Sequence, residues 1–123
     1  MSEQAIQTIS INVGAQAGTV NRPLFRVPTS DSAFGGITIT GAYIMAGAAA
    51  TSVLQLANMG TALGTAVSAV VGTLNATLVA NVQQALTVST PYQASGTWLG
   101  LKTLAGGGLD TVTILTIEFK WGK

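Results

Sequence analysis

The chain offers few side chains that could carry out chemistry, because it contains no histidine and no cysteine. Those residues are the commonest general acid–base group and the strongest side-chain nucleophile. Without them, Ser-His-Asp and Cys-His catalysis and zinc sites with histidine ligands cannot be built. The glycine-rich runs also fail to match a phosphate-binding loop, since none ends in Gly-Lys followed by Ser or Thr.

A pair of carboxylates, as in glycoside hydrolysis, is the catalytic arrangement that this composition still allows. The carboxylate side chains are Glu3, Asp31, Asp110 and Glu118. Asp31 and Asp110 lie in sequences typical of turns. Glu118 faces outward from an expected strand, beside Lys120. These are the positions of turn formers and of a solvated strand face. We therefore expect a protein that is not an enzyme and that uses no cofactor and no metal.

Charged residues are unusually rare, at 7% of the sequence, whereas soluble domains carry about 25%. None occurs between Asp31 and Lys102. Disorder is not expected there, because segments that stay unfolded are poor in aliphatic residues and this stretch is rich in them. The net charge of +1 protects little against self-association, so we expect much of the surface to be covered in the working state. The cations are too few and too scattered to predict a nucleic-acid partner.

The elements that position the charged and aromatic side chains are expected to be strands. Apolar and polar residues alternate along much of the chain, which is the pattern of a half-buried strand. It predicts strands at 7–13, 37–45, 53–59, 98–104 and 112–121. Prolines bound the segment 23–28, which predicts an arm or an edge strand. The segment 63–82 has leucine and valine at helical spacing, but Gly64 and Gly72 are unfavourable inside a helix. We predict strands and turns there.

Two of these segments carry more specific predictions. In 37–45 we expect one face to hold Ile37, Ile39, Tyr43 and Met45, and the other to hold Thr38, Thr40, Ala42 and Ile44. Gly41 between them predicts a bulge or a close approach of another backbone. The runs 98–104 and 112–121, joined by the glycines at 106–108, predict a β-hairpin. Many short strands with glycine-rich connections indicate an all-β fold, either a sandwich, a jelly roll or a barrel.

The proline-bounded segment also holds the candidate partner contacts. Arg22 and Arg26 flank Leu24 and Phe25, a composition that fits interface hot spots. In this interpretation Phe25 is the anchor and the two arginines are polar contacts on a neighbouring protein. A surface loop with two solvated charges explains the same residues equally well.

Two other functions stay open. A carbohydrate-recognition module would stack sugar rings on Trp98 or Tyr92, although Trp98 and Trp121 fit better as core or interface filler on facing strands. A small membrane protein would use the uncharged stretches 43–57 and 62–80. Both stretches hold several polar residues, and neither has the flanking Lys or Arg that sets topology. We therefore expect no membrane partner.

Three segments carry a resemblance to a known family. They are Gly36-Ile-Thr-Ile-Thr40 after an N-terminal arm, Gln93-Ala-Ser-Gly-Thr-Trp-Leu-Gly-Leu101 at the turn into a late strand, and the closing strand Val112-Thr-Ile-Leu-Thr-Ile-Glu-Phe119. With the Thr-, Ala- and Gly-rich middle, the chain resembles the small jelly-roll capsid decoration (head cement) proteins of tailed bacteriophages. Phage fibre and tail proteins share this sequence pattern, so the position of the protein in the virion stays open.

The resemblance implies a single-domain, jelly-roll-like β-sandwich with a flexible N-terminal arm. The strand and extended arm would span 1–36 and the sandwich core 37–123. It further implies a homo-oligomer, a trimer, that docks on the major capsid protein at the capsid surface of the virion. No catalytic, cofactor or metal residues come with that family. The start of the chain lacks a basic region followed by an apolar one, so we expect synthesis in the host cytoplasm without a secretory signal.

Overall fold

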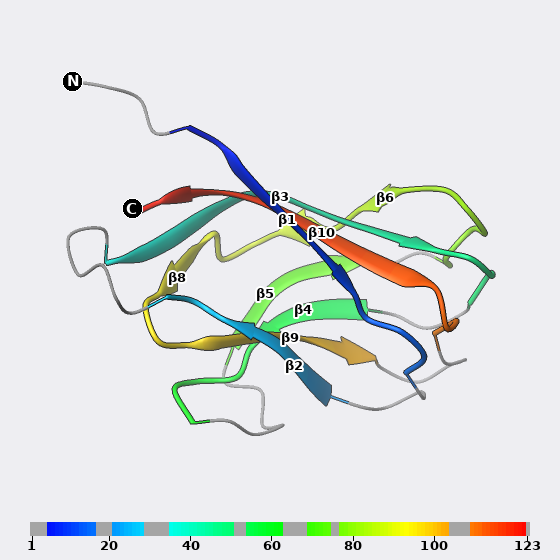
Figure 1. Cartoon of the computed structure of the whole chain (residues 1–123), viewed down its shortest axis with the longest axis horizontal. Helices are drawn as coiled ribbons and strands as arrows, with labels where there is room; N and C mark the ends of the chain where they lie inside the picture. The colour runs from blue at the N-terminus through cyan, green and yellow to red at the C-terminus, as the bar shows by residue number, and fades with distance from the viewer. Residues whose placement is uncertain are drawn as a thin grey trace.

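The computed structural model describes residues 5–16, 21–28, 35–50, 54–62, 69–74, 77–103 and 109–122. Every regular element in these ranges is a β-strand, and the strands form two five-stranded antiparallel sheets packed on each other (Figure 1). The predicted all-β sandwich is confirmed. No helix in the described ranges is long and apolar enough to cross a membrane.

The chain passes from one sheet to the other at nearly every connection. The first sheet has the order β1 (Gln7–Asn12), β10 (Thr113–Trp121), β3 (Gly36–Ala46) and β6 (Gln84–Ala85), and β8 (Tyr92–Ala94) pairs with the other end of β3. The second sheet has the order β2 (Asn21–Arg26), β9 (Trp98–Thr103), β4 (Leu54–Asn58), β5 (Ala69–Leu74) and β7 (Thr87–Val88). Among these strands, β4 and β5 are the one consecutive pair that stays in the same sheet.

Aliphatic side chains from both sheets form one shared core. In β10, Leu115 and Ile117 are fully buried, whereas Thr116 and Glu118 are partly exposed. The largest fully buried side chains are Val13, Val27, Ile37, Ile44, Leu54, Leu56, Val71, Leu78, Leu99, Leu101, Leu115 and Ile117. Buried apolar surface stabilises by about 25 cal/mol per Å², so this core is the main force that holds the two sheets together.

Residues 1–36, expected as an N-terminal strand and extended arm, contribute one strand to each sheet. β1 pairs with β10. β2 is the edge strand beside β9, which is the edge position that the prolines predict. The guanidinium of Arg22 in β2 donates to the carbonyl oxygen of Val13 at 2.7 Å, so it ties β2 to the end of β1. Residues 1–4, 17–20 and 29–34 lie outside the described ranges.

The ambiguous segment 63–82 contains β5 and no helix in its described residues, 69–74 and 77–82. The prediction of strands and turns is confirmed there. Gly72 is buried in β5 opposite Val88 of β7. A Cβ at this position would lie 3.1 Å from the carbonyl oxygen of Thr87, so the glycine permits the close approach of β7.

The two faces of β3 were predicted wrongly beyond Gly41. Ile37 and Ile39 are buried as expected, but the buried residues after the glycine are Ala42, Ile44 and Ala46. The predicted bulge is confirmed, because the register passes from Ile39↔Phe119 to Gly41↔Glu118 and leaves Thr40 as the extra residue. One extra residue reverses which side chains face the core. Tyr43 and Met45 therefore point outward.

The predicted hairpin of 98–104 and 112–121 is also wrong. β9 pairs with β2 and β4, and β10 pairs with β1 and β3, so the two strands belong to different sheets. Alternation specifies that a strand has one apolar face, but it does not specify which strand lies beside it. Here the apolar faces of β9 and β10 meet across the core. The glycines at 106–108 lie outside the described ranges.

Candidate functional site

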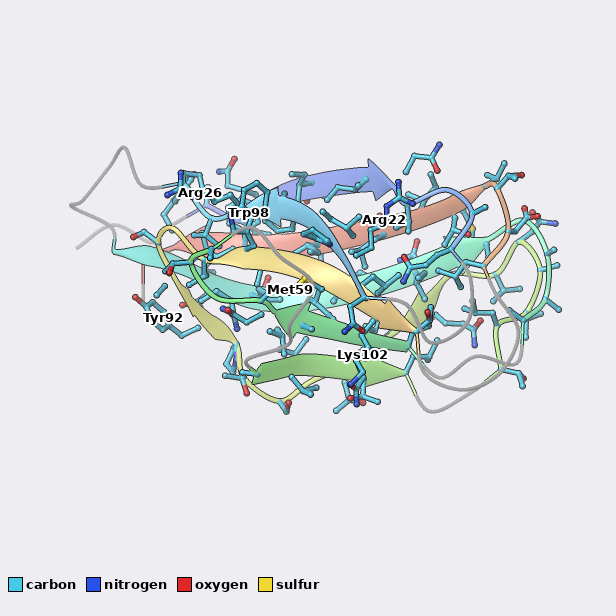
Figure 2. The ribbon with its side chains drawn as sticks, turned by 90° about the horizontal axis from the view of Figure 1, so that it is seen from below. Arg22, Arg26, Met59, Tyr92, Trp98 and Lys102 are labelled. Carbon is cyan, nitrogen blue, oxygen red and sulfur yellow. The ribbon has the colours of Figure 1, made fainter. Side chains whose placement is uncertain are left out.

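The outer side of the second sheet carries two cationic side chains and a tryptophan that are exposed or partly exposed. In β9, Leu99 and Leu101 point into the core, so Trp98, Gly100 and Lys102 point away from it. Figure 2 labels several of these residues. We call this surface the basic face and define it by Arg26, Met59, Trp98 and Lys102.

Arg26 and Trp98 lie next to each other on the basic face. They are direct partners in the β2–β9 register, so their side chains share one side of the sheet, and Figure 2 shows them at the same end of the two strands. Trp98 is partly exposed and Arg26 is exposed. The Nε of Arg26 donates to the carbonyl oxygen of Gly96 at 3.4 Å. A planar ring beside a planar guanidinium suits stacking together with bidentate hydrogen bonding.

Met59, the residue after β4, lies beside Trp98 on the same side of the sheet. Its backbone N–H donates to the carbonyl oxygen of Trp98 at 2.8 Å. A Cβ on Gly100 would lie 2.7 Å from the Cε of Met59, so the thioether lies over the glycine. Although Met59 is on the outer side of the sheet, it is only 5% exposed. The centre of the basic face is therefore apolar and packed.

Lys102 places a second positive charge on the other side of Gly100. It pairs with Asn21 of β2 and with Gln55 of β4, which makes a polar row across three strands. The charged strand residues of the second sheet are Arg22, Arg26 and Lys102, and its strands contain no carboxylate. The strands of the first sheet hold Glu118 and Lys120. Positive charge is thus concentrated on one sheet.

The three predicted partner contacts have different positions in the structure. Arg26 lies on the basic face, as described above. The guanidinium of Arg22 is exposed but bonds within the molecule, to the carbonyl oxygens of Val13 at 2.7 Å and Ala15 at 3.4 Å. Phe25 is partly buried and packs against the core. β2 therefore presents Arg26 outward and uses the ring of Phe25 for its own packing.

Two other aromatic residues in the described ranges, Trp121 and Tyr92, do not join Trp98 on the basic face. Trp121 packs against the core, as predicted, with its ring centroid 5.6 Å from that of Phe119 and the ring planes at 88°. Tyr92 lies on β8 in the first sheet, and its hydroxyl donates to the carbonyl oxygen of Gly35. Of the two predicted roles, core filling is wrong for Trp98, which points away from the core, whereas interface filling stays a prediction. Sequence reasoning also missed Met59 and Lys102 on this face.

The described carboxylates have local partners. The Oδ2 of Asp110 accepts the N–H of Val112 at 3.2 Å, as a turn residue does. Glu118 accepts a hydrogen bond from the hydroxyl of Tyr43, and this bond and the charge of the carboxylate raise the pKa of Tyr43. Within the described ranges, no group of three or more His, Cys, Asp or Glu residues could hold a metal ion.

Comparison with known proteins gives no family for this chain. No family model, no curated protein and no solved structure matches it. The function must therefore be argued from the fold and from the residues of the basic face.

Proposed function

We propose that this chain is a structural virion protein, a capsid decoration or cement protein of a tailed phage. It stabilises the head by oligomerising and by docking on the major capsid protein. The observation that carries the proposal is the charge of the basic face, where Arg26 and Lys102 point outward from a sheet whose strands hold no carboxylate. On a chain with so few charges, such a face suits a partner surface of opposite charge.

The strand order supports a jelly-roll interpretation of the sandwich. Successive strands alternate between the sheets except at β4 and β5, which gives β1-β10-β3-β6 in one sheet and β2-β9-β4-β5-β7 in the other. The two Greek keys of a jelly roll place their strands in this interleaved way, and jelly rolls are common in viral capsid domains and lectins.

Docking through the basic face has a simple physical basis. It would cover the ring of Trp98 and the aliphatic stems of Arg26 and Lys102, and apolar burial contributes about 25 cal/mol per Å² before the costs of association. The charges would mainly set orientation and association rate. Copies held side by side on a shell would link neighbouring capsid subunits and resist the outward pressure of packaged DNA.

Co-sedimentation with phage heads tests this function. The heads would be those of the phage that encodes the chain, stripped of their decoration protein. We expect the wild-type protein to co-sediment, with binding that weakens as salt rises. The double substitution Arg26→Glu and Lys102→Glu should weaken binding by about tenfold or more, since two attractive contacts become repulsive.

The matched control is Lys120→Glu, which makes the same change of charge as the single substitution Lys102→Glu, but on a strand of the first sheet. It should bind as the wild type does. Failure of the wild-type protein to bind heads at any salt concentration would contradict the proposal. Equal losses of binding for Lys120→Glu and for Lys102→Glu would contradict docking through the basic face.

One observation favours a second function, a carbohydrate-recognition module of a phage fibre or tail. Trp98 is partly exposed, points outward and lies beside Arg26, which offers a ring for stacking on a sugar and donors for its hydroxyl or acidic groups. A glycan array separates the two functions. Hits that Trp98→Ala abolishes and Trp121→Phe retains would favour the module, whereas an array without hits would remove it.

A further inference from the structure

β1 is an open edge of the first sheet. Among the described strands it pairs on one side only, with β10. The N–H of Val13 donates to the carbonyl oxygen of Thr113 at 2.8 Å, and residues of antiparallel strands face their partner alternately. The odd-numbered residues of β1 therefore direct their backbone groups at β10. Thr8, Ser10 and Asn12 direct their N–H and C=O groups to the open edge.

The features that usually keep an edge strand from pairing are missing from β1. It has no charged residue, no proline and no bulge. The other long edge, β2, has all three: Pro23 lacks an N–H, the register shifts between Pro23 and Phe25, and Arg22 and Arg26 add charge. The terminal strands β6 and β7 and the short β8 span only two or three residues.

Apolar side chains along β1 are incompletely covered. Ile9 packs against the core and remains partly exposed. Ile11 is partly exposed as well. Ile6, just before the strand, is 57% exposed. A strand added beside β1 would cover Ile9 and Ile11 further and would pair the outward backbone groups.

A second copy of β1 fits this edge better than other strands of the chain. Since β1 carries no charge, two copies can lie side by side without repulsion, whereas two copies of β2 would bring their arginines together. In a symmetric antiparallel pair, a residue whose backbone N–H and C=O point to the open edge must also lie opposite a residue of the same kind. Centring the two-fold axis on Ser10 achieves this, because Ser10 then meets Ser10 and Thr8 meets Asn12 of the second copy.

We propose that β1 forms a two-fold antiparallel pair with β1 of a second copy, centred on Ser10, so that the first sheets of two subunits become one continuous sheet. In this register Ile9 of each copy lies opposite Ile11 of the other, on the side that faces the cores. The close contact of β-branched side chains in such pairs adds to the backbone hydrogen bonds. The inference goes beyond the virion function and is independent of it, because it uses the sheet edge alone.

Sedimentation velocity over a concentration series tests the pairing. We expect the wild-type protein to form dimers, and Ser10→Pro to raise the dimer dissociation constant about tenfold or more, because proline removes the central N–H donor and obstructs the edge. The N–H of Ser10 points away from β10, so the substitution spares the intramolecular ladder. Ser10→Ala is the control, since it also loses the 3.0 Å contact between the hydroxyls of Ser10 and Thr116 but keeps the N–H.

A cross-linking experiment is independent of any effect on folding. The chain contains no cysteine, and residues paired across an antiparallel ladder are within reach of a disulfide. Under mild oxidation, Ser10→Cys should give a covalent dimer. Thr116→Cys, one strand further from the two-fold axis on the same side of the sheet, should not.

Four outcomes would overturn the pairing. Three of them are a wild-type protein that stays monomeric up to its solubility limit, a dimer that Ser10→Pro leaves unchanged, and equal cross-linking through positions 10 and 116. A trimer that forms without any β1-linked dimer would also overturn it, although that trimer would agree with the decoration function. Failure to bind phage heads would contradict the decoration function and leave the pairing intact.

Discussion

Gly100 is the residue on which the basic face depends most closely. A Cβ there would lie 2.2 Å from the carbonyl oxygen of Arg22 and 2.8 Å from the Cα of Pro23. Both atoms belong to the backbone of β2, so they cannot move without disturbing the β2–β9 pairing. The Cε of Met59 would lie 2.7 Å from the same Cβ, so the methionine side chain also occupies the space next to Gly100. The absence of a side chain thus permits both the bulged edge strand and the packed methionine.

Gly100→Ala should therefore destabilise the protein by about 1–3 kcal/mol, the usual cost of overpacking. Urea denaturation followed by circular dichroism measures this change. The control is Gly47→Ala, where the nearest atom to a new Cβ is the Oδ2 of Asp110 at 2.7 Å. That atom ends a side chain that can turn away, and the exposed N–H of Val112 that it then releases can bond to water, so the control should cost about 1 kcal/mol at most and less than Gly100→Ala. Equal losses of stability in Gly100→Ala and Gly47→Ala would contradict the close packing of β2 against Gly100.

Tyr43 gives a prediction about pH. Its hydrogen bond to Glu118 favours the neutral phenol and raises the pKa of Tyr43 above its ordinary value. A group whose pKa is raised on folding stabilises the protein below its unfolded pKa and loses that effect as pH rises through the folded pKa. Stability should therefore decline at strongly alkaline pH, above the ordinary tyrosine range, and Tyr43→Phe should reduce this decline.

Titration of tyrosinate absorbance checks the cause. Glu118→Gln should lower the pKa of Tyr43 towards its ordinary value, because it removes the carboxylate that opposes ionisation. Lys120→Gln, at the next outward position of β10, should not lower it. An unchanged titration in Glu118→Gln would exclude this carboxylate as the cause.

At the scale of elements, the bulge in β3 determines which residues form the core. Thr40 is the extra residue, and its presence places Ile39 and Ala42 on the same side of the strand. Deleting Thr40 should force one half of β3 to turn its apolar residues outward. Exposing buried aliphatic side chains on this scale should cost about 2–5 kcal/mol or more, comparable with truncating one of them.

Denaturant midpoints for the deletion and for Thr40→Ala provide the comparison. Thr40 is exposed, so the substitution keeps the residue count and should change stability by about 0.5 kcal/mol or less. A Thr40 deletion that folds with wild-type stability would mean that the register of β3 and β10 can adjust freely.

The same elements mark how far the sequence predicts the structure. Period-2 alternation identified β1, β3, β9 and β10, because each has one face in the core. Gly41 identified the bulge, but a glycine does not reveal how many residues its bulge inserts, so the faces beyond it were assigned wrongly. Strand partners depend on contacts distant in the chain, which explains the wrong hairpin of β9 and β10.

The candidate site was predictable only in part, for a related reason. Arg26 was selected because it lies near prolines, and β2 does present it outward. Arg22 and Phe25 share that sequence context, but the adjoining strand end and the core engage them. Alternation of Trp98 and Lys102 with buried Leu99 and Leu101 was a usable signal for the basic face. The position of Met59 over Gly100 requires the pairing of β4 with β9, which no local pattern contains.

For the whole molecule, the topology predicts slow folding. Most strand pairs join distant parts of the chain, such as β1 with β10 and β2 with β9, whereas β5 pairs with the nearby β4 and β7. Sandwiches dominated by non-local pairing fold in milliseconds to seconds, because loop closure must precede the favourable contacts. Stopped-flow refolding from urea measures the rate. Relaxation in microseconds would contradict this expectation.

The different surroundings of the two tryptophans have an optical consequence. Trp121 is packed edge-on against Phe119, whereas Trp98 points outward beside Arg26. A chain with Trp121→Phe would carry one indole fluorophore, located on the basic face. Iodide, drawn by the neighbouring guanidinium, would quench it more strongly than a neutral quencher of similar size would. The emission of that single ring would then report when an anionic surface covers the face, without any attached dye.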